Sequence, residues 1–181
     1  MKQTAIYTKG HFIILDIENG PLLYKIGFFG KPLEINKPKT PIFKARMILS
    51  FYEALYLMEN EELEILEESG LKMSREKLIS EANKFIDNFL EKYNVYKDLR
   101  NKGLVVKSGM KYGVTFMVYK YGPGIDHAPF LVDVVIRQEK ISSLEILRAG
   151  RLSHNVRKKL LLASVDPISR KITYYMIKWF I

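Results

Sequence analysis

The sequence contains no cysteine, only three histidines and no long apolar run. Without cysteine the chain cannot form disulfides, use a catalytic thiolate, or bind zinc or iron–sulfur clusters through sulfur. His11, His127 and His154 are too far apart in the sequence to suggest a metal cluster. No apolar stretch approaches the roughly 18 residues that span a bilayer, and the N-terminus lacks the apolar centre of a signal peptide. We therefore expect a soluble, cytoplasmic protein without a membrane partner.

Positive charge, by contrast, is in excess. The chain has 29 Lys and Arg against 20 Asp and Glu, a formal net charge of +9. Such a balance favours a polyanionic partner such as nucleic acid, although net charge alone is a nonspecific signal. With 181 residues and 48% hydrophobic content, the chain can bury one full core or two small ones, and disorder is not expected.

The first half of the chain, residues 1–84, is predicted to form a small mixed domain with an antiparallel sheet and helices. Asn19-Gly20 is a strong signal for a hairpin turn between strands. Apolar residues at helical spacing between Ile42 and Met58 indicate a helix with one buried face. The elements expected in this half are strands at 4–8, 11–17, 21–29 and 62–66, a helix over 42–58, and a helix over 74–84 that Ser74 caps.

The second half, residues 85–181, is predicted to form another mixed domain, in which helices flank a central mixed sheet. A helical pattern over 85–99 should stop at Gly103, and Ser142 with Glu145 matches a capping box for a helix that Gly150 should end. The strands expected in this half are 104–108, 111–121, 128–136, 160–165 and 172–180. The expected fold class is therefore α/β, of the α+β type, with two small mixed domains.

Two strand-like runs between Tyr112 and Val132 are joined by the loop Gly122-Pro123-Gly124. Tyr119 enters this loop and His127 leaves it, so both side chains should lie near one rim of the sheet. Elsewhere, Lys158 belongs to the densest basic cluster of the chain, residues 151–159.

Tyrosine, histidine and lysine without a pair of carboxylates suit phosphoryl chemistry in which RNA supplies its own 2′-hydroxyl nucleophile. A base takes the hydroxyl proton, an acid protonates the departing 5′-oxygen, and a cation stabilises the transition state. A tyrosine, with an ordinary pKa of about 10, is a base near neutrality only where cations lower that pKa. On residue types alone a structural role stays open, with Tyr119 an ordinary strand residue, His127 a loop residue and Arg157-Lys158-Lys159 a solvated face.

Short motifs in a fixed order along most of the chain resemble those of a known family. They are Glu53-Ala-Leu-Tyr-Leu57, Val95-Tyr-Lys-Asp-Leu-Arg-Asn-Lys-Gly-Leu-Val-Val-Lys107, Tyr112-Gly113, His127 followed by Phe130-Leu-Val132, and His154-Asn-Val-Arg-Lys-Lys-Leu-Leu-Leu-Ala163. Together they resemble the archaeal-type tRNA-splicing (tRNA-intron) endonuclease family. The last motif has Asn155 where the family usually has serine.

The resemblance implies a role for each candidate residue. Tyr119 would be the general base, His127 the general acid and Lys158 the cation at the transition state. The reaction would need no metal or other cofactor, and would leave 2′,3′-cyclic phosphate and 5′-hydroxyl ends at both intron boundaries of a bulge–helix–bulge. Arg151 would stack on a flipped base, and Arg157 would bind RNA. His154 and Arg157 belong to the last motif and would support the site rather than catalyse the reaction.

The implied partners are a precursor tRNA with its intron and further subunits. Family members built from one kind of subunit often carry an acidic loop between the last two strands. Here that loop, residues 166–171, has one acid and two cations. We therefore expect a catalytic subunit that forms a homodimer, a heterotetramer with a structural subunit, or both. The apolar ending, residues 174–181, could supply a strand to a dimer or simply complete the core.

Two other functions stay open at this point. One is a metal-dependent nuclease, in which two or more of Asp126, Asp133 and Glu139 hold magnesium. The other is a subunit that binds RNA or stabilises an assembly without catalysis.

Overall fold

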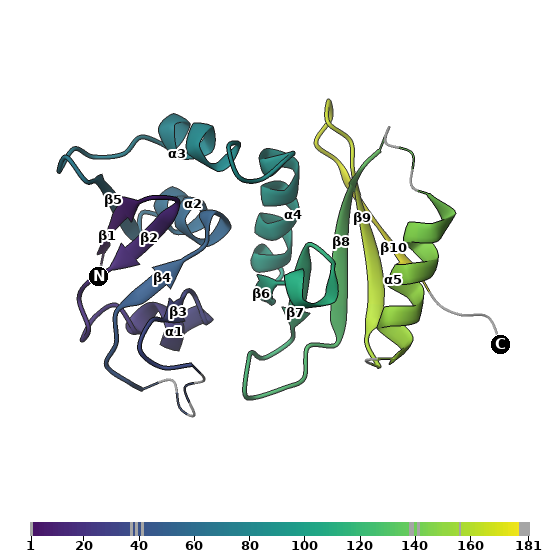
Figure 1. The fold of residues 1–181 in the computed structure, drawn as a ribbon, viewed down its shortest axis with the longest axis horizontal. Coiled ribbons are helices and arrows are strands. Elements are labelled where there is room, and N and C mark those ends of the chain that lie inside the picture. The colour runs from purple at the N-terminus through teal and green to yellow at the C-terminus, as the bar shows by residue number, and fades with distance from the viewer. Residues whose placement is uncertain are drawn as a thin grey trace. The chain divides into compact units, whose positions relative to one another are not determined.

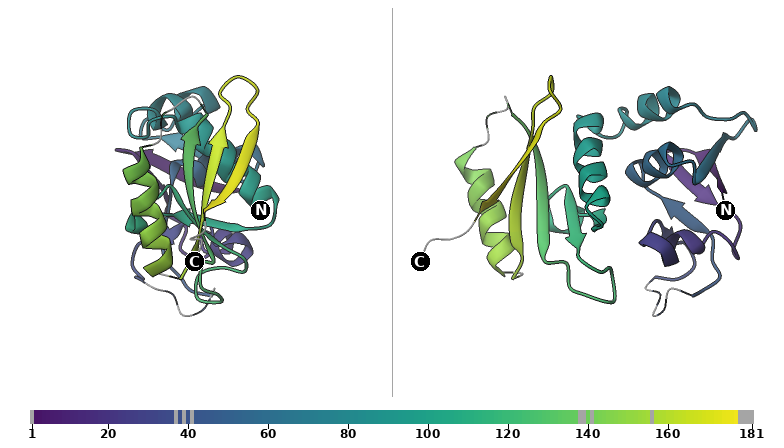
Figure 2. Two further views of the ribbon diagram at one scale, coloured as in Figure 1. Left: turned by 90° about the vertical axis from the view of Figure 1, so that its right-hand side faces the viewer. Right: turned by 180° about the vertical axis from the view of Figure 1, so that it is seen from behind.

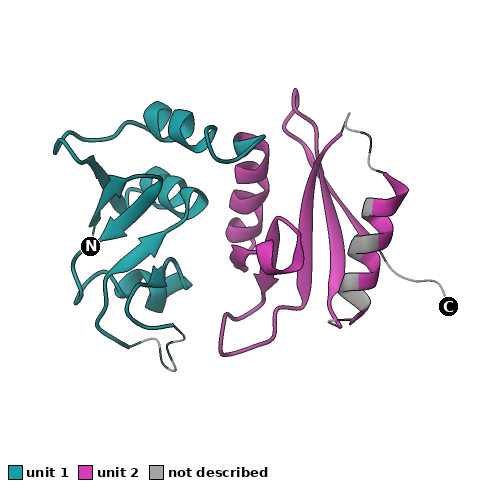
Figure 3. Ribbon diagram, in the orientation of Figure 1, with its two compact units in different colours: residues 1–89 teal, residues 90–181 magenta. Residues whose placement is uncertain are grey.

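The computed structural model describes residues 2–36, 38, 40, 42–137, 140, 142–155 and 157–177. Within it the chain forms two compact units, residues 1–89 and 90–181, each of which combines one sheet with helices (Figure 3). The α/β fold class with two mixed domains is therefore confirmed. The boundary between residues 84 and 85 stays a prediction about which segments fold on their own.

The first unit is built on a five-stranded sheet with the order β3-β4-β2-β1-β5 (Figure 1). Neighbouring strands are antiparallel, as predicted, except for β1 and β5, which are parallel, so this sheet is not antiparallel throughout. The strands are β1 (Gln3–Thr8), β2 (His11–Ile14), β3 (Lys31–Pro32), β4 (Met47–Leu49) and β5 (Leu63–Glu67), and the helices are α1 (Leu22–Gly27), α2 (Phe51–Glu59) and α3 (Arg75–Ala82).

Two elements predicted in the first unit are wrong, and the strand predicted over 11–17 ends already at Ile14. Within the strand predicted over 21–29, residues 22–27 form the helix α1 instead. The Asp16 carboxylate accepts the N–H groups of Glu18 and Asn19 and turns the chain before a hairpin can form. The helix predicted from residue 42 begins only at Phe51, since Ser50 and Glu53 form a capping box there. Residues 47–49, ahead of this box, pair in the sheet as β4.

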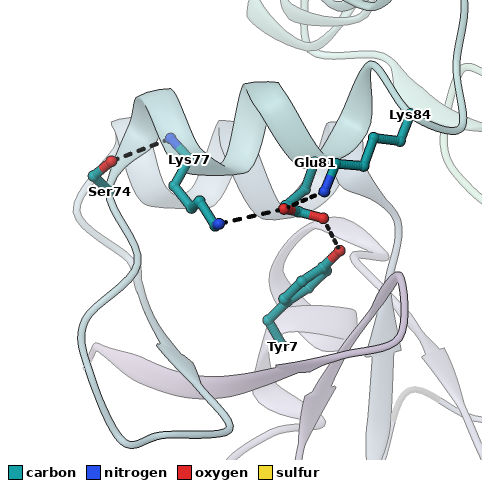
Figure 4. Close-up of polar contacts among 5 residues, drawn as sticks. All are labelled: Tyr7, Ser74, Lys77, Glu81 and Lys84. Atoms are coloured by element: carbon teal, nitrogen blue, oxygen red, sulfur yellow. Dashed lines mark hydrogen bonds and ion pairs between the residues drawn. The ribbon is translucent and has the colours of Figure 1, made fainter.

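A polar cluster holds α3 against β1 (Figure 4). Glu81 of α3 accepts a hydrogen bond from the Tyr7 hydroxyl at 3.1 Å, and the ammonium groups of Lys84 and Lys77 lie 2.8 and 3.5 Å from the same carboxylate. Burial and the bond to Glu81 raise the pKa of Tyr7 to about 12. The predicted cap is also confirmed, because the Ser74 hydroxyl accepts the N–H of Lys77.

The second unit contains a five-stranded sheet with the order β10-β9-β8-β7-β6. Strands β8 and β9 are parallel and the other pairs antiparallel, so the sheet is mixed as predicted. Helices α4 and α5 lie on its opposite faces (Figures 1 and 2). The elements are α4 (Phe89–Asn101), β6 (Val105–Ser108), η1 (Met110–Tyr112), β7 (Phe116–Tyr119), β8 (Phe130–Ile136), α5 (Ser143–Asn155), β9 (Lys159–Val165) and β10 (Ile172–Ile177).

The strand predicted over 111–121 is shorter than expected. Gly113, at φ 64°, ends the short helix η1, and β7 occupies only residues 116–119. The alternation predicted that Tyr112, Val114 and Phe116 share one face of a strand. Tyr112 and Val114 instead lie before β7 and do not share a face with Phe116. Val114 packs with Leu131 and Leu160, whereas Phe116 meets Tyr96 of α4 with ring centroids 5.9 Å apart.

The end predicted for α5 is also wrong. The helix passes through Gly150, which is buried, and continues to Asn155. A glycine inside a helix costs only about 1 kcal/mol relative to alanine, so it stops a helix only when the chain also turns there. The left-handed backbone lies further on, at Arg157 with φ 52°. The capping contact predicted for Glu145 and the end of the strand predicted over 172–180 lie outside the described residues.

Candidate active site

The ends of three inner strands lie together at one end of the second unit's sheet. Strand β7 ends at Tyr119, β8 begins at Phe130, and β9 begins at Lys159. Because β7 runs antiparallel to β8 and β8 runs parallel to β9, these three ends lie side by side (Figure 1). The fold therefore brings Lys158 to the same end of the sheet as Tyr119 and His127, which flank the loop between β7 and β8.

Tyr119 is half-buried and shares a sheet face with Met117, because side chains alternate along β7. Its hydroxyl donates to Sδ of Met117 at 3.6 Å. Phe116 and Val118 point to the other face, where α4 packs. The tyrosine is thus on the side of the sheet away from α4.

The loop between β7 and β8 is closed by hydrogen bonds within it. Gly122 accepts the N–H groups of Ile125 and Asp126, both at 3.1 Å. Pro123 followed by Gly124 at φ 86° has the composition of a type II turn. His127 follows this loop directly, and its side chain is exposed to solvent. The imidazole therefore lies at the surface, on a backbone that these hydrogen bonds hold.

Lys158 lies next to the residue that follows His127. Its ammonium group donates to the carbonyl oxygen of Ala128 at 2.5 Å and lies 5.9 Å from the centroid of the Tyr112 ring. An ammonium has three N–H donors, so this bond leaves two for a phosphate. The backbone N–H of the next residue, Lys159, donates to the carbonyl of Pro129 at 2.9 Å, so a second hydrogen bond joins the start of β9 to the segment that follows His127.

The two arginines predicted to bind RNA come from the neighbouring segment. Arg151 is an exposed residue in the second half of α5, and Arg157 is exposed in the link between α5 and β9. The side chain of His154 lies outside the described residues. Arg157 stands one residue before Lys158 in the chain.

The carboxylates considered for a metal site are used in two separate structural roles. Asp133 of β8 accepts the hydroxyl of Thr115 at 2.8 Å and its N–H at 3.2 Å. Asp126 accepts two backbone N–H groups of the β7–β8 loop. Glu139 lies outside the described residues. Among the residues with described positions, no group of three His, Asp or Glu could hold a metal ion.

Charge is distributed unequally between the two units. Residues 90–181 contain 17 Lys and Arg against 7 Asp and Glu, whereas residues 1–89 contain 12 against 13. The unit that carries Tyr119, His127 and Lys158 thus accounts for the whole positive excess of the chain. Such a concentration attracts a polyanion to that unit.

The sequence reading missed two contributors to the site. Asp126 was considered only as a metal ligand, although an aspartate at the close of a Gly-Pro-Gly loop is a residue type that caps turns. Tyr112 was predicted to lie in a strand. It lies instead in the short helix η1, with its ring beside the Lys158 ammonium. Of these two roles, only that of Asp126 had a signal in the sequence.

In the part of the chain that the structure describes, every helix is too short or too polar to cross a membrane.

Comparison with known proteins agrees with this arrangement. The family model for the catalytic C-terminal domain of tRNA intron endonuclease matches residues 89–174, and that for the N-terminal domain matches residues 7–79. A tRNA-splicing endonuclease of Hyperthermus butylicus is 46% identical over 167 residues, which is 92% of this chain and 92% of the relative. One of Sulfurisphaera tokodaii is 45% identical over 172 residues, 94% of this chain and 95% of the relative. The chain therefore belongs to the tRNA intron endonuclease family of enzymes.

Proposed function

We propose that this chain cleaves precursor tRNA at both intron boundaries of a bulge–helix–bulge, without a metal ion, by attack of the 2′-hydroxyl on the adjacent phosphate. The observation that supports the proposal is that Tyr119, His127 and Lys158 come from strand ends and a loop at one end of the sheet. They belong to the unit that holds the excess of Lys and Arg over Asp and Glu. Family membership supports the RNA substrate.

In the proposed reaction, ionised Tyr119 takes the proton from the 2′-hydroxyl as the bond between that oxygen and phosphorus forms. The bond from phosphorus to the 5′-oxygen breaks, and the His127 imidazolium gives its proton to that oxygen. The Lys158 ammonium stabilises the charge that develops on the non-bridging oxygens. The products are a 2′,3′-cyclic phosphate and a 5′-hydroxyl, and solvent restores both side chains by returning one proton and removing the other.

Arg151 and Arg157 would hold the RNA around this centre. Both side chains are exposed, and a planar guanidinium can stack on an unpaired base as well as pair with phosphate. We assign Arg151 to base stacking and Arg157 to the backbone near the scissile bond.

The magnesium-dependent alternative predicts a different response to a modified substrate. We expect the chain, with its partner subunit if one is needed, to cut an intron-containing precursor at full rate in EDTA. A precursor with 2′-deoxyribose on the 5′ side of each scissile phosphate should resist cutting, because it lacks the nucleophile. If instead EDTA abolished cutting, magnesium restored it, and the deoxy substrate were cut normally, a metal-activated water would be the nucleophile. Gel analysis of end-labelled RNA distinguishes the products.

For assembly, we propose a homodimer that joins a non-identical structural subunit. The single acid of the 166–171 loop, Asp166, is already used within its own unit, where it accepts the N–H groups of Ile168 and Ser169 and pairs with Arg137. The pKa of Asp166 lies below its usual range, chiefly because of the hydrogen bond from the N–H of Ser169. The N–H of Ile168 and the Arg137 side chain lower it further. The loop therefore offers little negative charge to a basic groove.

The edge strand β10 is the surface proposed for the dimer, since it exposes Tyr175 and Met176 at the border of the sheet. We expect a dimer in light scattering and a large gain in cleavage when the structural subunit is added. A stable homotetramer that is fully active alone would contradict this assembly.

A further inference from the structure

We infer that Asp126 is a positioning residue that sets the placement of His127 relative to Tyr119 and Lys158. The inference rests on the proposed function, because it needs these three residues to act together. It differs from the magnesium alternative, in which the same carboxylate would bind a metal.

Asp126 joins the two ends of the β7–β8 loop. One carboxylate oxygen, Oδ2, accepts the N–H of Lys120 at 3.0 Å, and the other, Oδ1, accepts the N–H of Gly122 at 2.7 Å. Lys120 directly follows Tyr119, and Asp126 directly precedes His127. The carboxylate thus fixes the backbone beside the proposed base to the backbone beside the proposed acid.

The connection continues from His127 to the proposed cation. Ala128, the next residue, gives its carbonyl oxygen to the Lys158 ammonium at 2.5 Å. Hydrogen bonds and peptide bonds therefore form one continuous path from Tyr119 through Lys120, Asp126 and His127 to Lys158. A single side chain, that of Asp126, accepts both of these backbone N–H groups from the β7 side of the loop.

Only a carboxylate meets both bonds well. Each of its oxygens can accept an N–H, and hydrogen bonds to an ionised acceptor are stronger than those between neutral groups. An asparagine at this position would keep one acceptor oxygen and turn an NH₂ group toward the other backbone N–H. An alanine would keep neither bond. The loop contains glycines at φ 135° and 86°, Gly122 and Gly124, which offer the backbone other conformations once the clamp is lost.

The test compares single-turnover cleavage and RNA affinity in Asp126→Asn and Asp126→Ala. We expect cleavage at saturating enzyme to slow by about 30-fold in Asp126→Ala and by about fivefold in Asp126→Asn, since a displacement of about 1 Å can cost up to about 100-fold. The dissociation constant for the RNA should stay the same or fall, because each change removes a negative charge near a polyanion. A rate and an affinity that change in opposite directions would not follow from simple loss of folded protein.

Asp16→Ala is the matched control, because Asp16 also closes a turn by accepting two backbone N–H groups, but in the first unit. It should cleave as the unchanged chain does. In a His127→Ala background, Asp126→Ala should add little further loss, since the acid that it positions is already absent.

Two results would overturn the inference. One is cleavage by Asp126→Ala within threefold of the unchanged chain, and the other is the same 30-fold loss in the presence and absence of His127. If the unchanged chain with its partner did not cut the precursor at all, the proposed function would fail instead. Activity of Asp126→Asn and Asp126→Ala that magnesium restores would assign the carboxylate to a metal site.

Discussion

Replacement of His127 by alanine is expected to slow single-turnover cleavage by about 10³-fold, within the range of about 10² to 10⁴ that a general acid contributes. The loss should be specific to departure of the 5′-oxygen, which leaves poorly without a proton. A substrate with sulfur in place of this bridging oxygen provides the diagnosis, because a thiolate leaves without protonation. We expect this substrate to restore the rate of His127→Ala to near that of the unchanged chain.

The same sulfur substrate should not rescue Tyr119→Phe, in which the proton of the 2′-hydroxyl has no acceptor. His11→Ala serves as the control for loss of an exposed histidine, since His11 lies at the start of β2 in the first unit. Circular dichroism melting checks that each variant is folded. The role of the acid would be refuted by cleavage at the normal rate in His127→Ala, or by equal rescue of His127→Ala and Tyr119→Phe.

The parts of the fold that could be predicted from sequence are those that local interactions decide. The strand β5, the Ser74 cap and the apolar strand β9 lie within one residue of their predicted positions, because a period-two pattern or an adjacent hydroxyl is enough to specify them. Residues 21–29 were wrongly predicted to form a strand because that prediction considered only their own apolar pattern and the Asn-Gly turn before them. It did not consider Asp16, which turns the chain by binding the N–H groups of Glu18 and Asn19. Local propensity is a weak guide when two turn signals compete.

The candidate site depended on information that the local pattern does not contain. The loop with Tyr119 and His127 was visible as two strands and a glycine turn. The link to Lys158, however, came only from family resemblance. Its physical basis is the parallel register of β8 and β9, which follows a crossover through α5 and pairs Phe130 with Lys159. The clamp by Asp126 was missed because a side chain that binds backbone N–H groups looks the same in sequence as a potential metal ligand.

Replacement of Lys158 by alanine is expected to slow the same single-turnover reaction by about 10²- to 10³-fold, the loss typical when one group that stabilises transition-state charge is removed. The ammonium is held by Ala128 at 2.5 Å beside the residue proposed as acid, so its position is defined before the RNA arrives. The loss should appear in the rate at saturating enzyme, because the negative charge that Lys158 is proposed to stabilise is larger in the transition state than in the bound substrate.

Lys159 provides a matched control in the adjacent position. The two lysines are adjacent in the chain, but their ammonium groups have different neighbours. That of Lys158 lies 5.9 Å from the centroid of the Tyr112 ring, and that of Lys159 lies 5.9 Å from the centroid of the Phe130 ring. Each alanine variant removes one positive charge, so a role limited to attracting RNA would weaken affinity to a similar extent in both. We expect the slow rate in Lys158→Ala alone, and equal cleavage rates in the two variants would show that Lys158 contributes charge but not catalysis.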